Sequence, residues 1–222
     1  MVRAHRTGLS GDGMTHSTAL RVAVLADRLF LYQSMACSDA TPEMMGLPQY
    51  PDHPIPDYET FCEDFTEEAL AGSDAFRQFI VTADDRDIGA ICYTVRERVA
   101  ELDIWIASRK DWGRGHGRRA LTQLIAWLEE RIPVDAMIMR PSARNERAIA
   151  VYGKAGFEIF DTERHQLPTW CLDGGEDYFD PVVMVRPAGP SGRNEGQWHV
   201  SRDRNNVWGS AVTLTGRADS LG

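Results

Sequence analysis

Two spacings of apolar residues divide this chain into predicted strands and predicted helices. Alternating or short continuous apolar runs predict strands, at residues 20–25, 78–82, 88–95, 100–107, 134–139, 157–161 and 180–185. Apolar residues spaced three and four apart predict helices, at the segment that follows Asp27, at 57–70, after the glycines near 115, and at 145–155. Strands followed by alternating helix and strand indicate an α+β (mixed α/β) fold. We expect the strands from 78 to 107 to form an antiparallel meander.

Three segments fit neither spacing. Residues 1–18 are rich in Gly, Ser, Thr and His, which predicts a flexible tail. Residues 38–56 contain five prolines, which exclude a regular helix. Residues 188–222 shift to Gly, Ser, Arg and Asn, and are predicted to be disordered or to dock on a partner subunit of a homodimer. One folded domain is therefore expected over residues 19–187.

Composition narrows the classes of function. The 222 residues are 43% hydrophobic and 26% charged, as in one ordinary globular core, and the net charge of −9 argues against a nucleic-acid partner and favours a cationic one. The four cysteines lie far apart without a CxxC pair, so neither a metal site nor a disulfide framework is indicated. No apolar run approaches the roughly 20 residues that span a bilayer. We expect no membrane association and a cytoplasmic location.

A glycine-rich turn, WGRGHG at 112–117, lies between a predicted strand and a predicted helix. Alternate glycines allow a tight turn whose backbone N–H groups point outward, and the positive end of the following helix attracts an anion. The predicted cradle for a diphosphate consists of Gly113, Arg114, Gly115, His116, Gly117 and Arg118. Alone, this pattern is as typical of a plain tight turn as of a phosphate site. The dinucleotide-binding and P-loop patterns do not match it.

A second segment, NERAIAVYGKAGFE at 145–158, makes the turn more specific. Asn145 can cap its helix and Gly156 can end it, while Ala148 and Tyr152 share one face. The two segments together resemble the core motifs of the GNAT acetyltransferase superfamily, over about residues 101–158. The resemblance implies the GNAT acyl-CoA N-acyltransferase fold, with a central, mostly antiparallel twisted sheet flanked by helices. It also implies that the turn holds the pyrophosphate of acetyl-CoA.

Within that superfamily, two branches are most similar, the aminoglycoside 6'-N-acetyltransferases and the ribosomal-protein alanine acetyltransferases. The similarity lies in ELDIWI, which leads into the Trp-Gly-Arg-Gly turn, and, for the first branch, in PSARNERAIAVYGKAGFE. Many members of the superfamily have Gln or Arg where Trp112 stands. Trp is common there in these two branches, so Trp112 narrows the resemblance to them. Besides the turn, the resemblance implies that acetyl-CoA is bound by Ile104, Trp105, Ile106, Trp112, Asn145, Ala148 and Lys154.

Candidate catalytic groups lie just before the turn and on the second helix. Glu101 and Asp103 share one face of their strand by alternation. The resemblance favours Asp103 as the base that takes the amine proton, with Glu101 in reserve; a solvated or salt-bridged carboxylate is the alternative. Tyr152, a core aromatic by its pattern alone, corresponds to the family tyrosine that protonates the CoA sulfur. A strand bulge near 104–107 is expected to free a backbone N–H for the developing oxyanion.

The acceptor side is predicted to be acidic. No Lys or Arg lies between Arg28 and Arg77, where the chain carries Asp39, Glu43, Asp52, Asp57, Glu59, Glu63, Asp64, Glu67, Glu68 and Asp74. Such a field would attract a polycationic amine, although the same carboxylates are equally typical of a solvated helix face. A second acidic group comprises Asp173, Glu176, Asp177 and Asp180, and an aromatic floor is predicted from Trp105, Tyr50 and Tyr58.

The resemblance thus predicts an N-acetyltransferase that moves an acetyl group from acetyl-CoA to a small cationic amine, aminoglycoside-like or polyamine-like. Direct attack within a ternary complex is expected, without a metal. An aminoglycoside acceptor would make antibiotic resistance a candidate role. Two alternatives stay open: acetylation of a protein N-terminus, of the ribosomal-protein type, and a catalytically silent acyl-CoA-binding regulatory module.

Overall fold

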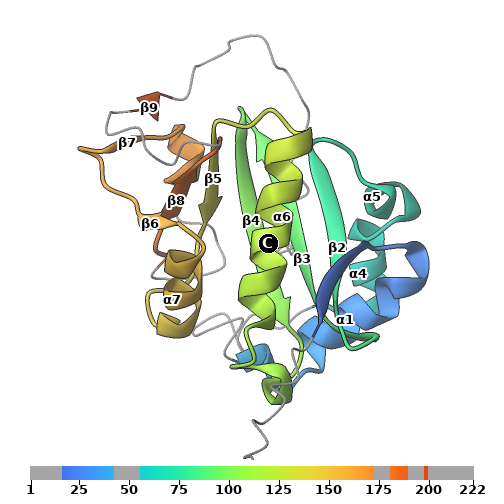
Figure 1. Cartoon of the computed structure of the whole chain (residues 1–222). Coiled ribbons are helices and arrows are strands. Elements are labelled where there is room, and N and C mark those ends of the chain that lie inside the picture. The colour runs from blue at the N-terminus through green and yellow to red at the C-terminus, as the bar shows by residue number, and fades with distance from the viewer. Residues whose placement is uncertain (1–16, 43–55, 173–180, 190–197, 200–222) are drawn as a thin grey trace, which may run out of the picture.

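A twisted sheet with helices on both faces forms the body of the computed structural model, which describes residues 17–42, 56–172, 181–189 and 198–199 (Figure 1). Within these residues the sheet has seven strands in the order β1-β2-β3-β4-β5-β8-β6. Their bounds are β1 (Thr18–Val22), β2 (Phe76–Ala83), β3 (Arg86–Arg96), β4 (Val99–Ile106), β5 (Ala136–Met139), β8 (Met184–Pro187) and β6 (Glu158–Ile159). Neighbouring strands pair antiparallel except β4 and β5, which run parallel. The predicted mostly antiparallel α+β fold is confirmed.

Helices cover the two faces of this sheet in two groups. Their bounds are α1 (Arg28–Ala36), α4 (Tyr58–Asp64), α5 (Glu67–Ala71), α6 (His116–Arg131) and α7 (Glu146–Lys154). The larger core packs α6 and α7 on one face, through residues such as Leu121, Leu124 and Tyr152. On the other face, Leu31 of α1, Phe61 of α4 and Leu70, at the end of α5, pack against the sheet. No helix in the described part of the chain is long and apolar enough to cross a membrane.

The predicted helix at 57–70 proves to be two short helices. Phe65 leaves helical geometry, with φ −93° and ψ 56°. Thr66 then starts α5, because its side-chain oxygen accepts a hydrogen bond from the backbone N–H of Ala69 at 3.2 Å. The apolar spacing continued through the break, so only the capping threonine marked it.

The ends of the sheet also differ from expectation. Strand β1 begins at Thr18, the last residue assigned to the tail, and pairs there with Ala83 of β2. Near the other end of the chain, β9 (Trp198–His199) pairs with β7 (His165–Gln166) in a small parallel sheet, where the sequence predicted no strand. Within the tail, residues 207–214 have a faintly strand-like sequence, and they lie outside the described residues.

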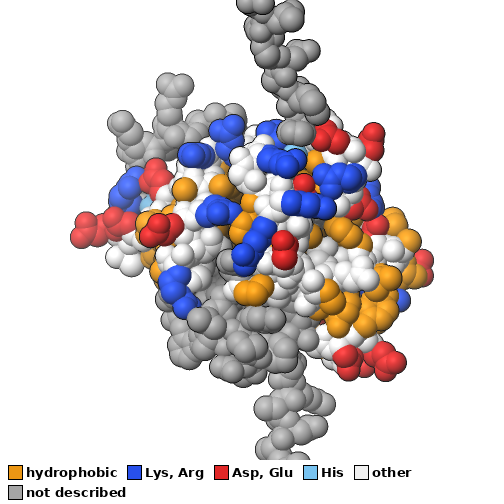
Figure 2. All heavy atoms as spheres, turned by 90° about the horizontal axis from the view of Figure 1, so that it is seen from below, with side chains coloured by type: hydrophobic (Ala, Val, Ile, Leu, Met, Phe, Trp, Pro, Cys, Tyr) orange, Lys and Arg blue, Asp and Glu red, His pale blue; other side chains and the backbone are white. Residues whose placement is uncertain are grey.

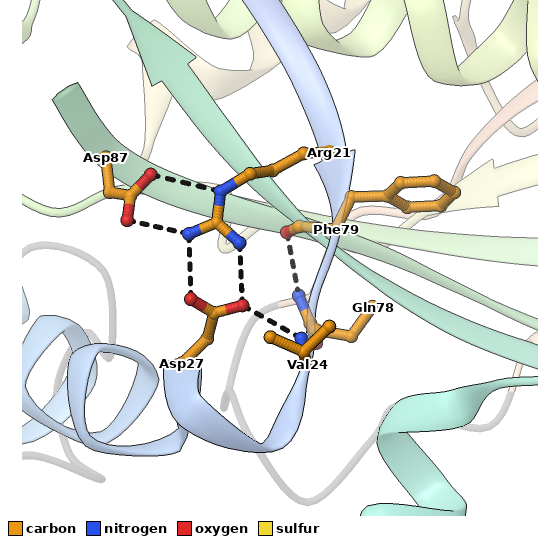
Figure 3. Close-up of polar contacts among 6 residues, drawn as sticks. All are labelled: Arg21, Val24, Asp27, Gln78, Phe79 and Asp87. Atoms are coloured by element: carbon orange, nitrogen blue, oxygen red, sulfur yellow. Dashed lines mark hydrogen bonds and ion pairs between the residues drawn. The ribbon is translucent and has the colours of Figure 1, made fainter. Parts of the chain in front are cut away.

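An ion-pair cluster fixes the reversal from β1 into α1 (Figure 3). Arg21 donates to both carboxylate oxygens of Asp27 at 2.7 Å, and to Asp87 of β3 at 2.7 and 3.3 Å. Asp27 also accepts from the backbone N–H of Val24 at 2.8 Å, and its carboxylate makes no capping hydrogen bond to α1. The hydrogen bond from Arg21 lowers the pKa of Asp27 below its ordinary value, against burial, which acts in the opposite direction.

Candidate active site

Strands β4 and β5 are paired for only part of their length. Their parallel pairing covers Val99 to Glu101 on β4, and ends where Glu101 pairs with Ile138. Strand β4 continues to Ile106, still paired with β3. The last five residues of β4 therefore have no strand neighbour on the β5 side within the described residues.

The backbone along this open side of β4 is available for a ligand. Ala107, just after β4, donates its N–H to the carbonyl oxygen of Ile88 in β3, at 2.8 Å. Because alternate residues of an antiparallel strand direct their N–H groups to opposite sides, those of Ile104 and Ile106 point toward the separated side. The β3–β4 register is continuous from Gly89 to Arg96, so the bulge predicted near 104–107 is wrong. Separation of β4 from β5 instead leaves these N–H groups without a strand partner among the described residues.

The glycine turn follows β4 and leads directly into α6. Gly113 and Gly115 adopt φ values of +74° and +80°, which favour glycine, and Gly115 is the residue immediately before the helix. The indole N–H of Trp112 donates to the Ile106 carbonyl at 3.0 Å, and the guanidinium of Arg147 lies 4.6 Å from the centre of the Trp112 ring. Trp112 thus joins the end of β4 to α7 across the start of the turn.

Basic side chains surround the beginning of α6. A pocket of about 370 Å³ is lined by Arg118, Arg119, Thr122, Gln123 and Lys154. Figure 2 views the end of the molecule where α6 begins and shows Lys and Arg side chains gathered over the middle of that face. Arg118 and Lys154, predicted from different motifs, therefore line one pocket, which is suited to an anion.

The ring of His116 is buried under the turn, and two residues that sequence reasoning missed contact it. Its Nδ1 atom lies 2.9 Å from the Thr18 hydroxyl and 3.2 Å from a terminal nitrogen of Arg119. Thr18 is 98 positions away in sequence. No local pattern could have indicated this contact.

Helix α7 supplies the second predicted group. Asn145 is its N-cap, and its side-chain oxygen accepts from the Ala148 N–H at 3.0 Å. The predicted capping role of Asn145 is therefore confirmed. Tyr152 is buried, with its ring centre 6.5 Å from that of Phe157.

The two candidate carboxylates share a face of β4 but have different surroundings. Glu101 accepts two hydrogen bonds of 2.7 Å from Arg140, which follows β5, at the last paired position of the two strands. Asp103 is exposed. By alternation it lies between Val99, in the apolar cluster near β8, and Trp105, in the cluster under α1. Asp103 therefore lies on β4 between the apolar cluster near β8 and the apolar cluster under α1.

Two cysteines lie near these carboxylates. Cys92 pairs with Asp103 across β3 and β4. Burial, and then the charges of Asp103 and Glu101, raise the pKa of Cys92 well above its ordinary value. Burial, and then the charge of Glu101, raise the pKa of Cys171 to about 12. Both thiols are therefore protonated at neutral pH and are poor nucleophiles.

The predicted acceptor wall is described only in part. The carboxylate of Asp57 caps α4 by accepting from the Thr60 N–H at 2.9 Å, and Asp39 accepts from the Arg109 N–H at 3.1 Å. Trp105 is buried under α1, whereas the exposed Tyr58 contacts the ring of Tyr32. Outside the described residues lie Glu43, Tyr50, Asp52, His53, Asp173, Glu176, Asp177 and Asp180.

Comparisons with known proteins agree with this arrangement. The family model of the acetyltransferase (GNAT) domain matches residues 19–158. The L-amino acid N-acetyltransferase AaaT of Escherichia coli (strain K12) is 29% identical over 126 residues, which cover 54% of this chain and 74% of that protein.

Solved structures give the same fold. The aminoglycoside acetyltransferase AAC(6')-Ib in complex with coenzyme A has a TM-score of 0.60 at 22% identity, over 77% of this chain and 95% of that one. The spermidine N-acetyltransferase from Vibrio cholerae, with CoA and spermine, has a TM-score of 0.59 at 16% identity, with the same coverage of both chains.

Proposed function

This chain belongs to the GNAT acetyltransferase family, and from that premise we propose that it moves an acetyl group from acetyl-CoA to a primary amine of a small cationic acceptor. One observation carries the proposal. The half of β4 that has separated from β5 is followed, after the short 3-10 helix Arg109–Asp111, by a positive-φ glycine turn at the start of α6. This places outward backbone N–H groups and a helix N-terminus beside an unpaired strand edge.

The donor side follows from this geometry. The turn residues from Gly113 to Gly117 would hold the pyrophosphate, with Arg118 and Lys154 adding positive charge from the lining of the adjacent pocket. The N–H groups of Ile104 and Ile106 would contact the pantetheine arm along the open edge of β4. Either could also stabilise the developing oxyanion of the thioester. The structures of AAC(6')-Ib and of the spermidine acetyltransferase, which share this fold, contain CoA.

The acceptor amine would react on the face of β4 that carries Asp103. Asp103 is the base in this proposal, because it is exposed while the two oxygens of Glu101 are bound by Arg140. It would take a proton from the ammonium form, so that the neutral amine attacks the acetyl carbonyl. Tyr152 would then protonate the departing CoA thiolate, and the proton that the nitrogen loses as the amide forms would pass through solvent to restore the Tyr152 phenol. Protonated Cys92 and Cys171 argue against an acyl-cysteine intermediate and support direct transfer.

Three classes of acceptor are suggested by the similar proteins. The structural neighbours are named for aminoglycosides and spermidine, which are polycations, and the curated relative is named for L-amino acids, which carry a carboxylate. The stretch of chain between Arg28 and Arg77 contains no Lys or Arg, and its acidic side chains favour the polycations.

A thiol-release assay with acetyl-CoA tests the proposal. Free CoA would be measured with an aminoglycoside, with spermidine, with a mixture of L-amino acids and without an acceptor. We expect acceptor-dependent release, with a higher kcat/KM for the polycations than for the amino acids. Release with the amino acids alone would overturn the cationic acceptor. The absence of acceptor-dependent release across the panel would overturn the enzymatic proposal.

A further inference from the structure

We propose that Thr18, at the start of β1, is a positioning residue for acetyl-CoA, because through Arg119 it sets the direction in which the glycine turn presents its backbone N–H groups. This inference rests on the proposed use of the turn by the CoA pyrophosphate. It assigns a role in donor binding to a strand that lies 98 residues before the turn.

The first step is the contact of Arg119 with the turn. A terminal nitrogen of Arg119 donates to the carbonyl oxygen of Arg114 at 2.9 Å. In a trans peptide the carbonyl and the following N–H point in opposite directions. Holding the Arg114 carbonyl on the Arg119 side therefore directs the N–H of Gly115 to the opposite side of the turn.

This restraint matters because glycine flanks Arg114 on both sides. Gly113 and Gly115 adopt positive φ and have no side chains that would hold the intervening peptides in place. A glycine turn can rotate its peptides at low energetic cost, so a cradle of ordered N–H groups needs an external restraint. The Arg119 guanidinium is such a restraint.

The second step is the contact that holds Arg119. Its Nε donates to the Thr18 hydroxyl at 2.9 Å, and its terminal nitrogen lies 3.2 Å from His116 Nδ1. Since arginine can only donate, Nδ1 is the acceptor, and the Thr18 hydroxyl, 2.9 Å from the same atom, donates to it. Thr18 therefore accepts one hydrogen bond from Arg119 and donates another to His116.

Strand β1 keeps Thr18 in place for these contacts. The side-chain amide of Gln123, one turn further along α6, donates to the Thr18 carbonyl at 2.8 Å, and Thr18 pairs with Ala83 of β2. The Thr18 hydroxyl thus links β1, through Arg119, to the Arg114 carbonyl of the turn. Without this hydroxyl, Arg119 can swing into the adjacent open pocket and release the Arg114 carbonyl.

The test compares Thr18→Val with Thr18→Ser. Valine keeps the shape of threonine but loses the hydroxyl, whereas serine retains it. Thr82→Val is the matched control, because the Thr82 hydroxyl also contacts β1, at the Ala19 carbonyl, 3.3 Å away, but has no contact with the turn. For each variant, the Kd of CoA would be measured by calorimetry, kcat and both KM values by thiol release, and Tm by thermal melting.

We expect Thr18→Val to raise the Kd of CoA and the KM of acetyl-CoA by about tenfold, as is typical for loss of a hydrogen bond to a charged group. The kcat and the acceptor KM should stay unchanged, since uniform donor binding alone is weakened. Thr18→Ser and Thr82→Val should behave like the wild type.

Two results would overturn the inference while leaving the proposed function intact: normal CoA binding by Thr18→Val, or an equal loss in Thr82→Val. A fall in Tm and kcat without a change in Kd would also overturn it, because Thr18 would then only support folding. Failure of the wild type itself to bind CoA would instead overturn the proposed function, and this inference with it.

Discussion

At the scale of single residues, the structure separates two carboxylates that the strand pattern treats alike. Glu101 joins β4 to the end of β5 at their last paired position, because Arg140, which follows β5, binds both of its carboxylate oxygens. Asp103, two residues further along the same face, is exposed on the open part of the sheet. The same side-chain chemistry is thus proposed to have two uses, one in holding the strands and one in proton transfer.

Substitution of each carboxylate by its amide distinguishes these uses. We expect Asp103→Asn to lower kcat by about 100-fold or more, because general base catalysis typically contributes that much, with an unchanged Kd for CoA. Glu101→Gln should instead lower the free energy of unfolding by about 1.5–3 kcal/mol through a weakened bond to the Arg140 guanidinium. Thiol release and urea denaturation measure the two effects.

A large loss of kcat in Glu101→Gln, with little change of kcat in Asp103→Asn, would assign the base to Glu101. Full activity of Asp103→Asn would exclude its carboxylate from the chemistry. Loss of turnover with retained CoA binding in this variant would argue against a catalytically silent CoA-binding module.

At the scale of elements, the glycine turn and its helix form one unit with α7 and β4. Trp112 bonds to the Ile106 carbonyl and lies against Arg147, so three elements meet at the start of the turn. Gly115 then enters α6 from the left-handed region, at φ +80°. A side chain at this position would be strained.

Gly115→Ala should therefore weaken CoA binding. An L-residue in the left-handed region costs roughly 1–2 kcal/mol, and the new Cβ would lie 2.9 Å from a terminal nitrogen of Arg119. Relief of this strain by rotation of the turn should raise the Kd of CoA by about tenfold.

The matched control is Gly153→Ala, at the second-last residue of α7. A Cβ there meets nothing within 4 Å, and alanine should not destabilise the helix, because its helix propensity exceeds that of glycine. Calorimetry with CoA and urea denaturation would be run on both variants. Equal CoA binding by the two would contradict a role for the turn conformation.

The reversal between β1 and α1 is a second element with a testable property. The pKa of Asp27 lies below its ordinary value of 3.8, chiefly because Arg21 bonds to the ionised form. The ionised Asp27 carboxylate therefore contributes its full stabilisation above pH 3.8. This stabilisation is lost as the pH falls through the depressed pKa.

Asp27→Asn should lower the free energy of unfolding by about 1–3 kcal/mol at neutral pH. The difference from the wild type should shrink as the pH falls from 3.8 through the depressed pKa, where the wild-type carboxyl also becomes neutral. Urea denaturation over a pH series measures this. Asp85→Asn, in the exposed turn between β2 and β3, is the matched amide substitution outside this ion-pair cluster. A pH-independent loss in Asp27→Asn would contradict the ionic role.

At the scale of the whole molecule, charge is distributed unevenly over the surface. The net charge is −9, yet Lys and Arg gather where α6 begins (Figure 2). The donor is an anion and the proposed acceptor a cation. Such a distribution would guide the two substrates to different parts of the surface.

The KM of a polyamine should therefore rise with ionic strength more than that of a monoamine. Between about 0.01 and 0.15 M the Debye length falls from about 30 to about 8 Å, so long-range attraction is mostly screened. Thiol release at these two ionic strengths, with spermidine and with a monoamine control, measures the effect. Equal salt dependence for the two amines would contradict steering by the acidic side.

The amino-acid sequence by itself determined most of the elements and the donor motif. Apolar spacing located the meander and α6, because side-chain burial follows the strand and helix periods. The glycines of the turn and the capping Asn145 were also readable, since their conformations depend on local chemistry.

Tertiary structure alone decided how these parts combine. Only the fold shows that β4 and β5 part after Glu101, that Arg140 binds this carboxylate, and that Thr18 reaches the turn through Arg119. The expected bulge in β4 was wrong, because the spacing of apolar residues does not show where two strands separate. The single helix at 57–70 was wrong, because the same spacing continues through the break before α5. These features depend on contacts between residues far apart in sequence, and such contacts exist only once the chain has packed.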